Sequence, residues 1–404
     1  MIRAQFILEL KKQSLLLYFI IGTVLVITLG LTSAHELSNT HSDWFGSDDA
    51  ERTADGTLSS EQELVAFYVQ QEMKQSNSST RVEERTEQSV AKYNAQKSVL
   101  LALENSNYSR VNMIVSKFET ENPELLQSES ILPNDFQAYF GQNRYSAYYS
   151  TKYLVQHGKK YTLEIEGFSS VLTKTFTALR YAITMAGNQY ELLALIIVSS
   201  AIVAMLMIFF KDTRAGTETF MSSSPLPSLV QAGIRSMVTV VLFNVLIVCA
   251  VTLVVGILSG IPGHPIGDLE YPFTIVIQGK CCTYPLWSIL LQYLLLCNLW
   301  LVVLASIAFC MSNLVNNQLI GMAVAGLLAF AQPLKILELL PSAMTRLSPG
   351  HYVNFAQVTL HLGEFTDISL PMIVEVFLGW SAVFMILGVV LLWVREHRYV
   401  VALQ

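Results

Sequence analysis

The sequence predicts an all-α polytopic membrane protein with six transmembrane helices and a large, mostly helical extracellular domain between the first and the second. Hydrophobic residues make up 52% of the 404 residues, whereas charged residues make up only 14%. The apolar residues gather in blocks close to the ~20 residues that cross the hydrocarbon core of a bilayer. One long polar stretch, residues 34–190, separates the first block from the others.

Six apolar blocks are expected to span the membrane. In chain order they are Leu15–Leu31, Leu192–Phe210, Met237–Ile257, Trp287–Cys310, Leu319–Pro333 and Met372–Val394. The fifth is the weakest, and we expect it to be short or broken. The first block could instead be a cleaved signal peptide, because Thr32-Ser33-Ala34 is a possible cleavage site. We expect it to be retained as a transmembrane helix over residues 15–33.

Basic residues beside the short loops predict the orientation, since loops rich in Lys and Arg stay in the cytoplasm. They lie before the first span, between the second and third, and after the last: Arg3, Lys11, Lys12, Lys211, Arg214, Arg235, Arg395 and Arg398. An even number of spans places all of these residues and both termini on the cytoplasmic side of a cell membrane. Residues 191–404 then supply transmembrane helices two to six.

Residues 34–190 form the expected extracellular domain. They hold 20 acidic and 14 basic residues, which accounts for the whole net charge of −6. An acidic outer surface is either simply solvated or attracts cationic cargo. Helix-forming stretches dominate the domain, and KYTLEIEG (residues 160–167) is a candidate strand. The domain contains no cysteine, which is typical of bacterial cells that do not rely on disulfides, such as Gram-positive ones.

Two further segments are expected at the membrane surface. Residues 1–14 place Ile2, Phe6 and Ile7 on one helical face, which predicts an interfacial amphipathic helix. Residues near 334–370 are too polar to span and too apolar for an ordinary loop. They predict an outer re-entrant segment of short helices, which is tolerated where protein covers it.

The sequence lacks the motifs of common enzymes. It contains no G-x-x-x-x-G-K-[ST] phosphate loop, no H-E-x-x-H and no G-x-S-x-G. We therefore expect a protein that is not an enzyme, with no catalytic residue, no metal site and no nucleic-acid partner. The polar residues within the spans are candidates for a substrate pathway: Asn244, Asn298 and Glu375.

The loop KDTRAGTETFMSSSPLPSLVQAGIRS, residues 211–236, is a polar interruption between two apolar spans. It contains Asp212, Arg214, Gly216, Thr217, Glu218, Phe220, Pro225 and Arg235, in that order. With the order of the spans, this pattern resembles the permease subunit of an ABC-2 type (type V) ABC exporter. The chain departs from the family pattern at Thr219 and Ser228, where the family has an acidic and a basic residue.

The resemblance implies that this loop forms a short coupling helix that docks on a separate ABC ATPase subunit, present in two copies. Asp212, Arg214, Gly216, Thr217, Glu218, Phe220 and Pro225 would make that contact. ATP and Mg²⁺ would bind the partner, so this chain would bind no cofactor. A second permease chain, identical or different, would complete the exporter within the membrane lipid. Hydrophobic or cationic peptides, toxins or drugs are the expected substrates. A helix of about two turns is too short to be stable alone, which agrees with a docked role.

Two other classes of membrane protein share some of these features. A membrane sensor with a ligand-binding ectodomain would need an inner output domain, but only REHRYVVALQ follows Val394. A MacB-like or FtsX-like mechanotransmitter also carries an ectodomain after its first span. That class has three spans after the ectodomain, whereas five are expected here.

Overall fold

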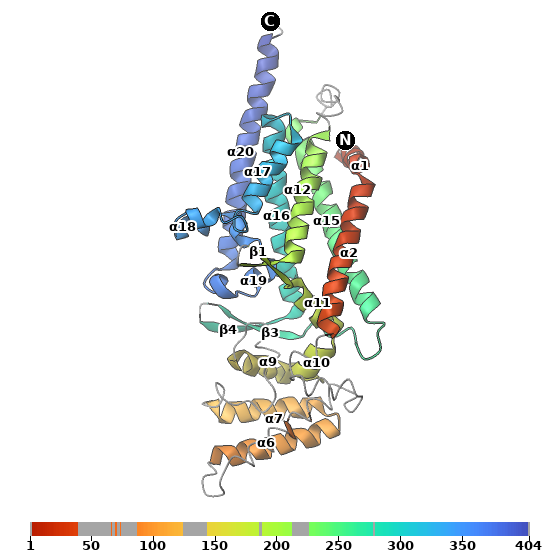
Figure 1. Cartoon of the computed structure of the whole chain (residues 1–404), viewed down its shortest axis with the longest axis vertical. Coiled ribbons are helices and arrows are strands. Elements are labelled where there is room, and N and C mark those ends of the chain that lie inside the picture. The colour runs from red at the N-terminus through yellow and green to blue at the C-terminus, as the bar shows by residue number, and fades with distance from the viewer. Residues whose placement is uncertain are drawn as a thin grey trace.

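The described part of the chain is predominantly helical. A computed structural model describes residues 2–38, 66, 69–70, 73, 87–123, 144–185, 188–211, 226–277 and 279–402. Five helices of this part are long and apolar enough to cross a membrane: α2 (Leu15–Ser38), α12 (Leu192–Phe209), α15 (Ser228–Leu258), α16 (Leu286–Leu314) and α20 (Leu370–Ala402). They form a bundle with both chain termini at one end, here named the terminal end (Figure 1). The opposite end is named the distal end.

The fifth predicted span is a short apolar helix, α17 (Gln318–Ala329), of 12 residues. Twelve residues rise about 18 Å, which is less than the ~30 Å hydrocarbon core. The helix begins where the Asn317 side chain accepts a hydrogen bond from the Leu319 backbone N–H at 2.9 Å. It ends at Ala329, and turns continue from Phe330 to Lys335, whose φ is +58°. The described residues therefore contain five helices of spanning length, where the sequence predicted six spans.

The central helix of the bundle is α16. Its most apolar window is 78% buried within the protein, against 17% to 22% for α2, α15 and α20. A helix that is apolar all round is expected at such a position. Trp300 on α16 is 1% exposed and donates its indole N–H to the Tyr352 carbonyl at 3.2 Å. α20 approaches α16 closely at Gly388, where a Cβ atom would lie 2.6 Å from the Phe309 ring.

Two β-hairpins add strands to the predicted all-α class. β1 (Ala182–Met185) and β2 (Asn188–Glu191) pair antiparallel and lead into α12. β3 (Pro272–Ile277) and β4 (Lys280–Pro285) pair in the same way and lead into α16. Each hairpin therefore lies directly before a long apolar helix.

Short helices join α17 to α20. They are η2 (Leu337–Leu339), α18 (Ser342–Thr345), η3 (Pro349–Tyr352), α19 (Phe355–Thr359) and η4 (Gly363–Phe365). Residues 348–356 are all buried, so protein covers this irregular backbone. Gly350 allows the close packing, because a Cβ atom there would lie 2.6 Å from the Leu328 carbonyl oxygen.

The helices beyond the distal end come from the segment between α2 and α12 (Figure 1). They are α6 (Glu87–Glu104), α7 (Tyr108–Glu121), α9 (Arg144–Gln156) and α10 (Leu163–Ser169), whereas α11 (Val171–Leu179), from the same segment, packs against α2 at the distal end. α6 and α7 share a small apolar core that includes Val99, Leu103 and Val115. The strand predicted at residues 160–167 is wrong, since Leu163–Ser169 is helical. A strand needs a neighbouring strand, whereas this stretch packs against the loop after α15: the Tyr271 hydroxyl donates to the Leu163 carbonyl at 3.1 Å.

The loop between α15 and β3 is fastened to α10 and α11. Lys159 Nζ lies 2.7 Å from Asp268 Oδ2, and the Asp268 backbone N–H donates to Glu166 Oε1 at 2.7 Å. Burial tends to raise the pKa of Asp268, but the hydrogen bond and charge of Lys159 lower it overall. Gly267 lies against Ser170 with a φ of +97°, and a Cβ atom there would come within 1.8 Å of Ser170 Oγ. Only glycine fits this contact.

Candidate functional site

The predicted coupling residues lie outside the described residues. They are Asp212, Arg214, Gly216, Thr217, Glu218, Phe220 and Pro225. Both flanks of that segment are described. α12 ends at Phe209 and is followed by Lys211, and α15 begins at Ser228 after Leu226 and Pro227. These flanks lie at the terminal end of the bundle, beside the amino-terminal helix α1 (Ile2–Lys12) (Figure 1).

A buried ion pair fastens α1 to α15. Glu9 is fully buried, and its carboxylate accepts hydrogen bonds from Arg235 Nε at 3.1 Å and Arg235 Nη2 at 3.3 Å. The two bonds reach different carboxylate oxygens, which is the bidentate geometry that arginine favours. Gln5 Nε2 donates to the same carboxylate at 2.9 Å, and Lys12 Nζ lies 3.5 Å from it. The Glu9 carboxylate is thus surrounded by donors from two helices.

Arg235 also contacts α12. Its guanidinium carbon lies 5.4 Å from the centroid of the Phe209 ring, within the range of a cation–π interaction. Phe209 is the last residue of α12. One buried arginine of α15 therefore touches both the first helix and the end of α12.

A second set of contacts joins the same three helices. Lys211 Nζ donates to the Lys12 carbonyl, which ties the end of α12 to the end of α1. Gln13 Nε2 donates to Thr239 Oγ1 on α15 at 3.3 Å, and the Tyr18 hydroxyl donates to Gln13 Oε1 at 2.9 Å. Both flanks of the predicted coupling segment are therefore attached to α1. We name the residues Glu9, Gln13, Phe209, Lys211 and Arg235 the α1 junction.

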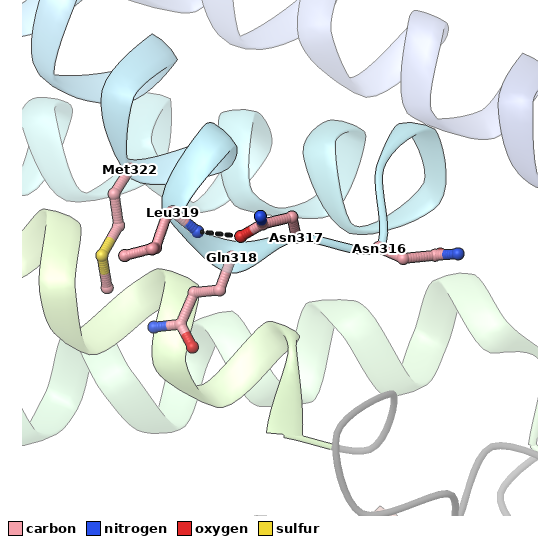
Figure 2. A pocket seen from close by; sticks show the side chains of 5 residues that line it. All are labelled: Asn316, Asn317, Gln318, Leu319 and Met322. Atoms are coloured by element: carbon pink, nitrogen blue, oxygen red, sulfur yellow. Dashed lines mark hydrogen bonds between the residues drawn. The ribbon is translucent and has the colours of Figure 1, made fainter.

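An open pocket of about 600 Å³ lies at the turn between α16 and α17 (Figure 2). Its lining is formed by Asn316, Asn317, Gln318, Leu319 and Met322. Next to this pocket, the first turn of α17 packs on the last turns of α12. A Cβ atom on Gly321 would lie 3.0 Å from the Leu206 side chain. The lining offers amides and apolar groups but no titratable side chain, so it supplies no group for acid–base chemistry.

The structure brings two of the predicted pathway residues together. Asn244 Nδ2 on α15 donates to Asn298 Oδ1 on α16 at 2.8 Å, and Asn298 Nδ2 donates back to Asn244 Oδ1 at 3.0 Å. Each amide also donates to a carbonyl of its own helix, Val240 or Leu294. All four amide N–H groups are thereby used, which suits an apolar environment.

Glu375, the third predicted pathway residue, does not join this pair. It is exposed and lies in the second turn of α20. The amides, by contrast, lie in the middle of α15 and α16. The predicted pathway residues thus form one pair and one separate surface carboxylate.

Sequence reasoning missed Glu191, which is fully buried at the start of α12. Its carboxylate accepts backbone N–H bonds from Ala356 and Gln357, both at 2.8 Å, in the first turn of α19. The Glu191 N–H donates to Asn354 Oδ1 at 3.1 Å. Burial raises the pKa of Glu191 to about 7, against the lowering effect of the Ala356 and Gln357 N–H groups. The only signal in the sequence is an acidic residue directly before an 18-residue apolar run.

In the described ranges, no group of three or more His, Cys, Asp or Glu side chains could hold a metal ion. The described cysteines form no disulfide. Comparison of the chain with models of protein families, with curated proteins and with solved structures found no match.

Proposed function

We propose that the chain is the permease subunit of an ABC exporter, which moves substrate outward with energy from a separate ATPase subunit. One observation carries the proposal: the α1 junction attaches both flanks of the loop between α12 and α15 to the same amino-terminal helix. A force applied at that loop by a partner would reach three helices together. Five helices of spanning length and the resemblance of the loop to a coupling segment support this reading.

The burial of the ion pair supports a mechanical role for the α1 junction. Removing one partner of a buried ion pair costs about 3–5 kcal/mol, because the other charge is left buried, so the junction requires both Glu9 and Arg235. A connector loop without a partner would not need its flanks fastened in this way. In this proposal ATP-driven closure of two ATPase subunits displaces the loops of two permease chains. α1, α12 and α15 move with them as one body.

The pathway for substrate would lie between two permease chains. The Asn244–Asn298 pair would keep α15 and α16 in register while the α1 junction moves. The acidic residues between the first and second spanning helices would favour cationic cargo at the outer face. Hydrophobic or cationic peptides, toxins and drugs fit these properties.

The test is affinity purification from the native cell in mild detergent, with mass spectrometry of the proteins that co-elute. We expect a stoichiometric ATPase that contains a phosphate loop. A variant with Gly216–Phe220 replaced by a Gly/Ser linker should lose that ATPase while the chain remains inserted in the membrane. A matched control, Lys97→Gln with Arg110→Gln, changes exposed residues on α6 and α7 and should keep it.

Either of two results would contradict the proposal. One is a clean preparation without an ATPase, repeated across several detergents. The other is equal recovery of the ATPase with the linker variant. The first result would favour a membrane sensor. In that case the contact of Lys159 with Asp268, in the loop after α15, would transmit ligand binding from the ectodomain to the helix bundle.

A further inference from the structure

α1 turns Gln5 and Glu9 inward and most of its apolar side chains outward. Gln5 and Glu9 are 7% and 0% exposed, and both contribute to the α1 junction contacts. The exposed apolar residues are Ile2 at 63%, Ile7 at 44%, Leu8 at 41% and Leu10 at 42%. A surface helix facing water shows the opposite distribution, because its apolar stripe packs on the core. The outward face of α1 is therefore suited to an apolar neighbour.

The charged side chains on this outward face are basic. Arg3, Ile7 and Lys11 follow one another at intervals of four residues, so two cations flank one apolar side chain along a single face. Both cations are exposed. Glu9, the one acidic residue in the sequence of α1, is buried against Arg235. Lys211, beside the end of α1, is exposed as well.

The outward face continues directly into the outer face of α2. Only Gln13 and Ser14 separate the two helices. The first residues of α2 include Leu15, Leu16 and Phe19, which are 85%, 69% and 72% exposed. Such side chains at the end of a helix of spanning length suit lipid.

We propose that the outward face of α1, formed by Arg3, Ile7, Leu10 and Lys11, binds the surface of an anionic phospholipid bilayer. The apolar residues enter the boundary between headgroups and acyl chains, and the cations hold lipid phosphates. The exposed apolar residues of α1 favour lipid over a protein partner, because they are followed directly by the exposed apolar residues at the start of α2, a helix of spanning length. The α1 junction then joins the bilayer surface to α12 and α15. This inference does not depend on the identity of any ATPase.

The test measures hydrogen–deuterium exchange of the α1 backbone in the full-length protein. The protein is reconstituted in nanodiscs of phosphatidylcholine alone and in nanodiscs that also contain phosphatidylglycerol. Each cation near an anionic surface strengthens attachment about fivefold. We therefore expect α1 to exchange at least about fivefold more slowly when phosphatidylglycerol is present.

The variant Arg3→Gln with Lys11→Gln should lose this lipid dependence, and high salt should weaken it in the unmodified protein. The control pair Lys97→Gln with Arg110→Gln removes the same two charge types far from α1 and should retain it. Equal exchange in both kinds of nanodisc would overturn the proposal. Protection that depends on an added ATPase subunit and not on lipid charge would also overturn it, because the face would then bind protein.

Discussion

Glu9 and Arg235 lie 226 residues apart in the sequence and meet in a buried, bidentate ion pair with bonds of 3.1 and 3.3 Å. The pair joins the first helix to α15, and Arg235 extends the contact to Phe209 at the end of α12. Its position explains why the first dozen residues fold onto the bundle instead of forming a separate arm.

The substitution Arg235→Leu should destabilise the protein by about 3–5 kcal/mol, because it removes both arginine hydrogen bonds from a fully buried carboxylate and leaves it with Lys12 Nζ, 3.5 Å away, as its cation. Denaturant unfolding in detergent, followed by the circular dichroism of the helices, would measure this loss. The double variant Glu9→Leu with Arg235→Leu should recover much of it, since no buried charge then remains.

A surface ion pair provides the control for this prediction. Lys117 and Glu121 are 74% and 61% exposed, and their charged atoms lie 3.8 Å apart. Lys117→Gln should change stability by no more than about 0.5 kcal/mol. If Arg235→Leu had as small an effect as Lys117→Gln, the α1 junction would not hold the helices together.

Asn244→Val and Asn298→Leu should each weaken the contact between α15 and α16. Hydrogen bonds between helices in a membrane are worth about 0.6–2 kcal/mol. A double-mutant cycle on unfolding should therefore give a coupling energy near 1 kcal/mol. Thr252→Val on α15 is the control, because the exposed Thr252 hydroxyl bonds only to a carbonyl of its own helix, at 2.7 Å, among the described contacts. A coupling energy of zero between the two asparagines would show that the amides act independently.

Gly267→Ala should be markedly more destabilising than Gly263→Ala. Both glycines have positive φ, +97° and +88°, so both substitutions strain the backbone by about 1–3 kcal/mol. Only at Gly267 would the new Cβ atom strike a side chain, Ser170 Oγ at 1.8 Å, whereas nothing lies within 4 Å of the same atom at Gly263. The difference in melting temperature between the two variants measures the effect of the Ser170 clash, because the backbone strain is common to both. Equal melting temperatures would mean that the loop after α15 is not held against α11.

Stability should fall as pH rises through the neutral range because of Glu191. Its pKa is about 7 in the folded protein, above the ordinary value of 4.5, so the folded state binds the proton more tightly. The contribution is complete below about pH 4.5 and is lost as the pH passes through 7, an effect of roughly 3 kcal/mol. Glu191→Gln should flatten this part of the stability profile, measured by denaturant unfolding at a series of pH values. If Glu191→Gln did not alter the profile, the slope would belong to other groups.

The sequence by itself determined the position of the long helices that are apolar enough to cross a membrane. Apolar runs close to bilayer thickness, such as Leu192–Phe209 and Leu286–Leu314, form helices because backbone hydrogen bonding must be satisfied within each segment. The sequence also identified the fifth apolar block as the weakest candidate span, and this block forms the short helix α17. The amides Asn244 and Asn298 stood out because polar side chains are rare among apolar residues.

Only the tertiary structure decided which polar residues meet and which helix lies at the centre. Glu9 and Arg235 looked like ordinary charges on a surface helix and in a loop, because sequence distance gives no sign of their contact. Glu191 looked like a boundary residue, and its burial depends on α19, more than 160 positions later. The strand predicted at residues 160–167 was wrong because a strand forms only beside another strand, and the sequence of one segment does not show which segment lies next to it. A spanning helix needs no such neighbour, because its backbone hydrogen bonds are made within the segment.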